Sequence, residues 1–162
     1  MILFLDFDGT LHPLWTFERG ENSVIAVPYS GPWLVEAPTL ERILQPYLHR
    51  VEIVLSTAWA RMRGLEAARG MLPAAIAARV TDSIWLPELA IDYQASRCSR
   101  FSCIQMWLER RRAGYAGPWL ALDDDDELWP AEQRHRLVHA VGTLAELLVQ
   151  SELAVMLSRH LD

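Results

Sequence analysis

Lysine is absent from this chain of 162 residues, because all fifteen of its Lys and Arg positions are Arg. A basic side chain that contacts a phosphate is therefore expected to be a guanidinium, a planar donor that stays protonated. Acidic residues outnumber basic ones, and the formal net charge is −6. Nucleic-acid grooves usually carry a basic excess. A dedicated groove of that kind is therefore not expected, although a nucleic-acid end is not excluded as a substrate.

Cysteine is scarce and long apolar runs are missing. The two cysteines, Cys98 and Cys103, do not form a Cys-x-x-Cys pair. The first residues lack a basic segment and include two acids by position 8, which does not fit a secretion signal. We therefore expect reduced thiols in a cytoplasmic protein. No apolar run is long enough to span a bilayer, so no membrane partner is expected.

The order of apolar patterns predicts an α/β fold. The length suits a single domain, residues 1–162. The expected strands are residues 1–5, 51–55, 80–86, 119–122 and 137–141, with a further short strand at 23–27. The expected helices are residues 40–48, 60–78 with a break near 70–73, 101–108 capped at Ser99, and a last helix that opens on a capping box at 143–146. Such alternation predicts a mainly parallel central sheet with helices on both faces.

The most informative pattern is at the start, where five apolar residues run into Asp6-Phe7-Asp8-Gly9-Thr10. Near the end of a strand, carboxylates two residues apart can point to the same side. Two acids held this close repel each other unless a cation lies between them. Mg²⁺ suits the position because it binds one or two carboxylates together with phosphate oxygens. For the Asp-Gly dipeptide alone, an ordinary turn is the alternative.

Two later strands also run into polar residues. Residues 51–55 lead into Ser56 and Thr57, and residues 119–122 lead into Asp123 and Asp124. Ligands bind outside the carboxyl ends of the strands in such sheets. A hydroxyl can bind a phosphate oxygen without adding charge, and the alternative is that Ser56 and Thr57 cap the next helix. For the acids, the alternative is a solvated acidic turn.

In this order the motifs resemble those of the haloacid dehalogenase-like (HAD) phosphohydrolase superfamily. The resemblance implies a Rossmann-like sheet, Asp6 as the nucleophile that forms an aspartyl-phosphate, and Asp8 as the acid that later acts as a base. It also implies a Mg²⁺ site made by Asp6, the main-chain carbonyl of Asp8 and Asp124 as a direct ligand, with Asp123 as support.

The resemblance assigns phosphate binding to a hydroxyl and to a basic residue at the start of a helix. Thr57 is the preferred hydroxyl, with Ser56 next to it. The family usually has Lys as the basic residue, and this chain departs from that pattern. Arg97 and Arg100 are the candidates, and Arg100 is preferred because a helix is expected to begin there. Its charge would neutralise that of Asp6 and the phosphoryl group, whereas the alternative is a solvated surface Arg.

HAD enzymes carry cap insertions, but residues 11–38 have room for only a small β flap. A minimal or capless domain is therefore expected. Capless members act on large substrates such as phosphoproteins or nucleic-acid ends, or borrow a lid by oligomerising. Within the flap, packing is the expected role of Trp15 and Trp33, with lining of the substrate mouth as the alternative. His12 is a minor candidate for substrate contact.

The predicted function is a Mg²⁺-dependent phosphatase that acts through an aspartyl-phosphate on an unidentified phosphate monoester, small or macromolecular. Two alternatives stay open. One is a non-catalytic binding or regulatory domain of the same fold, which the missing Lys supports. The other is a phosphotransferase. The chain is also similar to small HAD domains associated with RNA-repair proteins.

Overall fold

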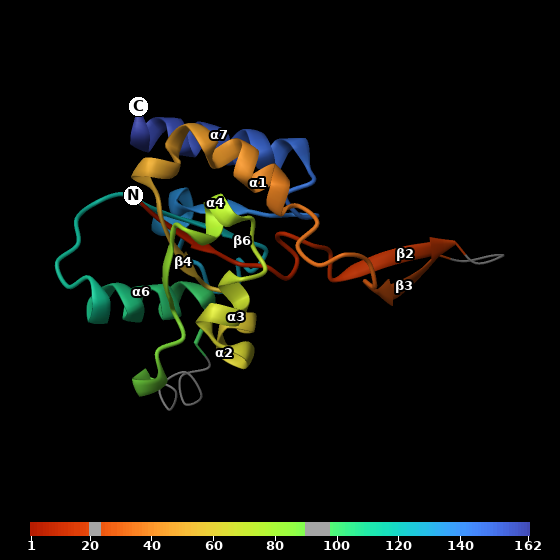
Figure 1. The fold of residues 1–162 in the computed structure, drawn as a ribbon, viewed down its shortest axis with the longest axis horizontal. Helices are drawn as coiled ribbons and strands as arrows, with labels where there is room; N and C mark the ends of the chain where they lie inside the picture. Colours follow the sequence, from red (N-terminus) through yellow and green to blue (C-terminus); the bar gives the residue numbers. More distant parts are fainter. Residues whose placement is uncertain (20–23, 90–97) are drawn as a thin grey trace.

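The computed structural model describes residues 1–19, 24–89 and 98–162, and its centre is a five-stranded sheet (Figure 1). The strands are β1 (Ile2–Leu5), β4 (Glu52–Leu55), β5 (Val80–Ser83), β6 (Trp119–Asp123) and β7 (Leu137–His139). They are parallel and lie in the order β5-β4-β1-β6-β7. In this register Leu5 of β1 pairs with Leu55 on one side and with Leu122 on the other. The residues that follow these three positions therefore meet at one edge of the sheet.

Helices cover both faces of the sheet, as predicted. They are α1 (Ala37–Leu44), α2 (Ala58–Arg63), α3 (Leu65–Arg69), α4 (Ala74–Ala77), α6 (Arg100–Arg111) and α7 (Leu147–Leu161). Alternate residues of β1 point to opposite sides, so Leu3 and Leu5 pack with α1 and α7, whereas Ile2 and Phe4 pack with α6. Figure 1 shows α1 and α7 together on one side of the sheet and α6 on the other. The predicted Rossmann-like α/β architecture is confirmed.

Several predicted boundaries are wrong for local reasons. The first helix ends at Leu44, and the chain continues as the 3-10 turn η1 (Gln45–Arg50), because Pro46 cannot continue an α-helix. The predicted helix 60–78 breaks also at Gly64, whose φ is +86°. β5 and β7 end at Ser83 and His139, before the predicted 86 and 141. Two further 3-10 turns are η2 (Pro87–Leu89) and η3 (Ala131–Arg136).

The two predicted helix caps have different outcomes. Ser99 caps α6, and its side chain accepts a hydrogen bond from Ser102 N at 3.2 Å. The capping box at 143–146 is wrong. Thr143 has a positive φ of 83° and accepts from Ala145 N at 3.1 Å, so its hydroxyl closes a turn, and Glu146 is the N-cap of α7 without a side-chain bond.

The insertion at 11–38 contains a small antiparallel hairpin, in agreement with the predicted flap. β2 (Trp15–Arg19) pairs with β3 (Val24–Pro28), and the hairpin projects away from the sheet (Figure 1). β3 corresponds to the predicted strand 23–27, although Ser23 lies outside the described residues. β2 was not predicted. Its Trp-Thr-Phe start has high β propensity, but it stands in a stretch rich in Pro and Gly.

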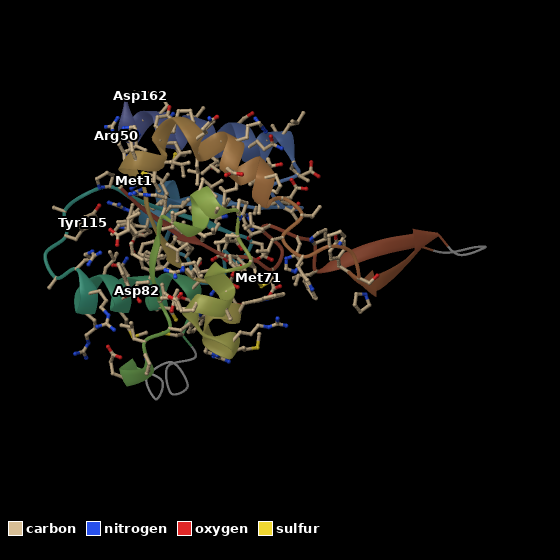
Figure 2. All side chains as sticks on the ribbon, in the orientation of Figure 1. Met1, Arg50, Met71, Asp82, Tyr115 and Asp162 are labelled. Carbon is tan, nitrogen blue, oxygen red and sulfur yellow. The ribbon has the colours of Figure 1, made fainter. Side chains whose placement is uncertain are left out.

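The two ends of the chain meet at the sheet edge that is opposite the carboxyl ends of the strands. The Met1 ammonium group donates to Arg50 O at 3.0 Å, and the Arg50 guanidinium donates to Leu161 O. Figure 2 shows Met1, Arg50 and Asp162 side by side at this edge. Within the described ranges, no helix has the length and apolar character needed to cross a membrane.

Candidate active site

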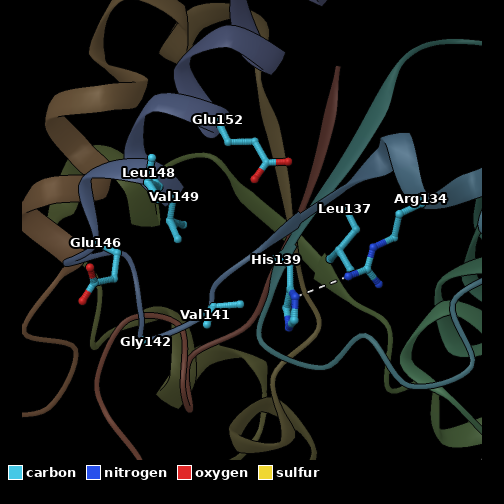
Figure 3. A pocket seen from close by; sticks show the side chains of 9 residues that line it. All are labelled: Arg134, Leu137, His139, Val141, Gly142, Glu146, Leu148, Val149 and Glu152. Carbon is cyan, nitrogen blue, oxygen red and sulfur yellow. Dashed lines mark hydrogen bonds between the residues drawn. The ribbon is translucent and has the colours of Figure 1, made fainter.

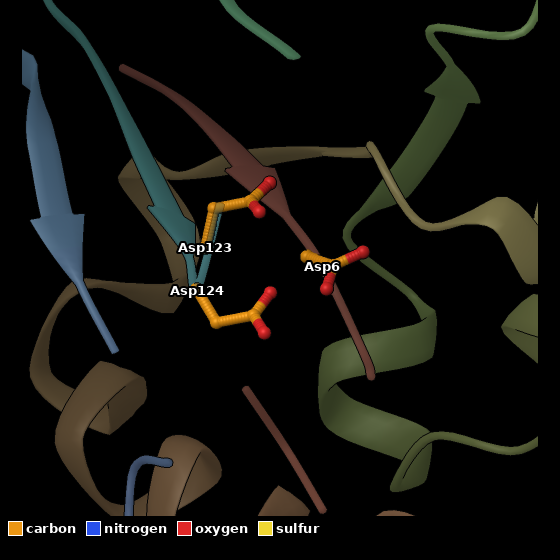
Figure 4. A group of neighbouring side chains, drawn as sticks. All are labelled: Asp6, Asp123 and Asp124. Carbon is orange, nitrogen blue, oxygen red and sulfur yellow. The ribbon is translucent and has the colours of Figure 1, made fainter. Parts of the chain in front are cut away.

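Three acidic side chains gather where β1 and β6 end. Asp6 follows β1, and its backbone N–H donates to Leu122 O at 3.1 Å, which holds it beside Asp123 and Asp124. Each of these three acids offers a carboxylate oxygen, and the three oxygens lie within 4.8 Å of one another (Figure 4). Asp6 and Asp123 are buried and Asp124 is partly exposed. The parallel register thus brings together residues that are more than a hundred positions apart in the chain.

The turn after β1 packs tightly against this cluster. Gly9 has a φ of +73°, and a Cβ built on it would lie 2.0 Å from Asp124 Oδ2. Only glycine fits a backbone that comes this close to a carboxylate in this conformation. On the other side of Asp124, its carbonyl oxygen accepts from His139 Nε2 at 2.9 Å. Asp124 is therefore fixed between the β1 turn and β7.

The electrostatics of the cluster favour a bound cation. Burial raises the pKa of Asp6 well above its usual value, and the neighbouring Asp123 raises it further. Burial also raises the pKa of Asp123 to about 7, although the Arg100 guanidinium opposes this. The pKa of Asp124 is raised as well, chiefly by burial. Three crowded carboxylates offer the hard oxygen ligands that Mg²⁺ prefers, so these residues fit a Mg²⁺ ion.

Arg100, the first residue of α6, lies inside this site. Its Nη2 donates to Asp6 Oδ1 at 3.3 Å and its Nη1 donates to Ser56 O. Its Nε lies 2.8 Å from Asp123 Oδ2, which is an ion pair rather than a well-directed hydrogen bond. The alternative of a solvated surface Arg is wrong, because only 14% of this side chain is exposed. The other candidate, Arg97, lies outside the described residues.

Arg100 keeps its charge in this buried position. Burial by itself lowers the pKa of a guanidinium, but Asp123 and Asp6 act in the opposite direction, and the pKa of Arg100 is raised overall. The cation is thus already aimed at the acid that the family resemblance makes the nucleophile. The arrangement can offset negative charge that a phosphoryl group brings to Asp6.

The two hydroxyl residues after β4 have different partners. Ser56 Oγ donates to Asp123 Oδ2 at 3.3 Å, so it braces the acidic cluster. Thr57 is the N-cap of α2, and its Oγ1 accepts from Trp59 N at 3.2 Å. The helix-capping alternative therefore describes Thr57 correctly. It does not exclude phosphate binding, because the cap uses a lone pair of Oγ1 and leaves the O–H as a donor.

The Asp8 side chain lies apart from the three clustered acids and is held by two ring nitrogens. Trp59 Nε1 donates to Asp8 Oδ2 at 2.8 Å, and His12 Nε2 lies 3.0 Å from Asp8 Oδ1. Burial lowers the pKa of His12, although Asp8 acts against this shift. The contact of Trp59 with Asp8 was not predicted from the sequence, and His12, a minor candidate for substrate contact, is found beside Asp8. Only the pairing of β1 with β4 brings positions 8 and 59 together.

The remaining acids of the tetrad that starts at Asp123 lie outside the cluster. Asp125 N donates to Asp123 Oδ1 at 3.1 Å, and Asp126 pairs with Arg134 at the surface at 2.7 Å. Neither Asp125 nor Asp126 therefore belongs to the group of three clustered acids.

Comparison with known families identifies the domain. A family model described as the HAD domain in Swiss Army Knife RNA repair proteins matches residues 2–145. The chain belongs to this HAD family. No curated protein and no solved structure matches the chain significantly. Membership indicates a phosphohydrolase type of activity, and HAD domains generally use Mg²⁺. The matched residues include every strand of the central sheet and end before α7.

A hollow of about 680 Å³ lies elsewhere on the HAD domain, between β7 and the start of α7 (Figure 3). It is lined by Arg134, Leu137, His139, Val141, Gly142, Glu146, Leu148, Val149 and Glu152. His139 connects this hollow to the acidic cluster, because its Nε2 bonds to Asp124 O and its Nδ1 lies 3.3 Å from Arg134 Nη2. The acidic cluster, rather than this hollow, contains the three close carboxylates and the buried guanidinium of Arg100.

We expect Mg²⁺ to stabilise the HAD domain, and to do so more strongly as the pH rises. Because the pKa values of Asp6 and Asp123 are raised, the folded metal-free state binds more protons than the unfolded state between about pH 4 and 7. Metal-free stability should therefore fall as the pH rises through this window. Mg²⁺ binds the ionised acids, and at about 100 times its Kd it should add about 2.7 kcal/mol, or roughly 5 to 10 °C in Tm.

Thermal melts at about pH 5 and about pH 7.5, with and without millimolar Mg²⁺, measure this effect. Asp124→Ala should reduce the Mg²⁺-induced shift, whereas Glu127→Gln, an exposed acid just beyond the cluster, should leave it intact. An identical Tm with and without Mg²⁺ at both pH values would show that the acidic cluster is not a metal site.

Proposed function

We propose that this HAD domain is a Mg²⁺-dependent phosphomonoesterase that removes phosphate from RNA ends through an aspartyl-phosphate on Asp6. The observation that carries the proposal is the position of Asp6, which contacts the buried cation Arg100 and lies beside Asp123 and Asp124. The family description, a HAD domain in RNA repair proteins, favours an RNA end as the substrate. A flap of one hairpin leaves room for such a large substrate.

In the first step a carboxylate oxygen of Asp6 attacks the phosphorus atom, and the bond from phosphorus to the leaving oxygen breaks. Asp8 gives its proton to that oxygen. Arg100 and the Thr57 hydroxyl bind the non-bridging oxygens and offset their charge. Asp6, Asp124 and the Asp8 carbonyl, with Asp123 as support, would hold Mg²⁺, which would supply further charge neutralisation as a Lewis acid.

In the second step Asp8 acts as a base. A water molecule gives a proton to Asp8 and attacks the same phosphorus atom, and the bond between phosphorus and Asp6 breaks. Inorganic phosphate leaves and the carboxylate of Asp6 is restored. Trp59 and His12 act as positioning residues, because they hold both oxygens of Asp8 in one orientation through the two steps.

Beryllofluoride with Mg²⁺ mimics a phosphoryl group on Asp6 and tests the site without turnover. The wild-type domain should bind it, and Arg100→Ala should weaken binding by about 10- to 100-fold, the loss expected for hydrogen bonds to a charged group. Arg100→Lys, which restores the residue usual in the family, should keep most of the affinity. Arg110→Ala, at the exposed end of the same helix, is the matched control. Isothermal calorimetry measures all four proteins.

The same preparations decide between the proposal and its alternatives. They are incubated with RNA oligonucleotides phosphorylated at either end, and released phosphate is measured. If the wild-type domain neither binds the mimic nor releases phosphate, the non-catalytic alternative becomes the better interpretation. Transfer of the phosphate to an added alcohol in place of water would identify a phosphotransferase.

A further inference from the structure

An exposed tryptophan, Trp33, contacts the two residues that hold the Asp8 carboxylate. The ring centroids of Trp33 and Trp59 are 4.9 Å apart at an interplanar angle of 71°, and those of Trp33 and His12 are 5.4 Å apart at 86°. Trp59 and His12 are also the two residues that hold the Asp8 carboxylate. Trp33 packs on these two rings as expected, but only in part, because 57% of it is exposed whereas Trp59 and His12 are buried.

The backbone next to Trp33 is in an unfavourable conformation. The next residue, Leu34, is buried in the core and has a φ of 49°, in the left-handed region that a leucine rarely adopts. Strained backbone of this kind persists where the surrounding structure fixes it, and it clusters at functional sites. The edge-to-face contacts with Trp59 and His12 fix the ring as well. Trp33 is therefore a rigid aromatic surface beside the acid of the active site.

A cation lies next to this aromatic surface. The Arg63 guanidinium lies 4.5 Å from the centroid of the Trp59 ring, which Trp33 contacts. A second arginine of α2, Arg61, lies 5.3 Å from the centroid of the Trp85 ring. Both arginines are exposed on α2, the helix that Thr57 caps. Stacking on an aromatic face holds a guanidinium in one orientation. In a chain with a net charge of −6, this is a local positive surface beside the phosphate site.

We propose that Trp33 stacks on the terminal nucleobase of a single-stranded RNA end, while Arg63 pairs with the adjacent backbone phosphate. The inference rests on the proposed phosphatase function and identifies the part of the substrate that lies beyond the phosphoryl group. Asp8 protonates the leaving oxygen, and Trp59 connects Asp8 to Trp33, so the ring is on the leaving-group side. Unpaired bases stack on aromatic side chains with little dependence on sequence. A base-paired end would keep its terminal base in the duplex stack.

Measuring RNA binding to the Asp6→Asn variant tests the stacking of Trp33 on the terminal base without turnover. The ligands are an RNA oligonucleotide with a terminal phosphate and the same oligonucleotide with an abasic terminal residue. Base stacking should make the first ligand bind about 5- to 150-fold more tightly than the second. Trp33→Ala should bring this ratio close to one, and Trp33→Phe should keep most of it. Tyr115→Ala removes an exposed aromatic residue at the opposite edge of the sheet and should leave the ratio unchanged (Figure 2).

Arg63→Ala tests the cation separately. It should weaken both ligands by a similar factor and reduce the dependence of binding on salt, because it removes a phosphate contact and no base contact. Arg110→Ala, an exposed arginine on α6, is its control. If Trp33→Ala weakens both ligands equally or neither, the inference is overturned.

Other outcomes separate this inference from the proposed function. If the affinity ratio collapses in Trp33→Ala although the wild-type domain releases no phosphate, the stacking surface stands and the phosphatase proposal fails. If wild-type turnover is the same on base-bearing and abasic ends, the phosphatase proposal stands and the stacking inference fails. If Trp33→Ala impairs a phosphotyrosine peptide and not the RNA end, the surface serves a protein substrate and the inference is wrong.

Discussion

Asp6→Asn should lower kcat for phosphate release by roughly 10⁴- to 10⁶-fold, the scale seen when an enzyme loses its nucleophile. The amide keeps the size of the side chain and can still accept the hydrogen bond from Arg100, but it has no negative charge with which to attack phosphorus. The fold should tolerate the change, because burial and Asp123 already disfavour the ionised form of Asp6. Tm should therefore not fall while activity disappears.

Covalent labelling checks the assignment directly. Wild-type protein incubated with a ³²P-labelled substrate and quenched in acid should carry a label that hydroxylamine removes, as expected for an acyl phosphate. Asp6→Asn should carry none. Asp126→Asn, an exposed acid three residues beyond Asp123, should label as the wild type does. Labelling of Asp6→Asn at the wild-type level would place the nucleophile at another residue.

Asp8→Asn should slow turnover by about 10² to 10⁴-fold, the usual contribution of general acid–base catalysis. The loss should depend on the leaving group. The p-nitrophenolate group of p-nitrophenyl phosphate leaves without needing a proton, so this aryl phosphate should still phosphorylate Asp6. The aspartyl-phosphate should then accumulate, because no base remains to activate water. Trp59 can still donate to the amide oxygen, so the local structure should persist.

Rapid-quench kinetics with an aryl and an alkyl phosphate measure this difference. Trp59→Phe is the matched variant, since it removes the indole donor and keeps the acid, and it should cost less than Asp8→Asn on both substrates. An Asp8→Asn variant that turns over both substrates as fast as the wild type would remove Asp8 from the acid–base role.

The location of the acidic cluster followed from the sequence because it depends on one rule. Apolar runs before Asp6 and Asp123 predict buried strands, and the carboxyl ends of parallel strands share an edge. The structure shows the strand register, in which Leu5 pairs with Leu122, so that Asp6 and Asp123 follow at the same edge. The boundaries of individual elements were less predictable. Pro46 and Gly64 ended helices early, and Thr143 took a turn conformation in place of a helix cap.

The sequence by itself determined the α/β class, the acids that end the strands, and the absence of any lysine that could bind a phosphate at the site. Only the tertiary structure decided that Arg100 contacts Asp6 from 94 residues away, that Trp59 holds Asp8 from 51 residues away, and that Trp33 faces solvent. The physical reason is that periodicity reports which side of its own element a residue occupies. Contacts between elements depend instead on how the sheet and its helices pack together, and no local pattern encodes that packing.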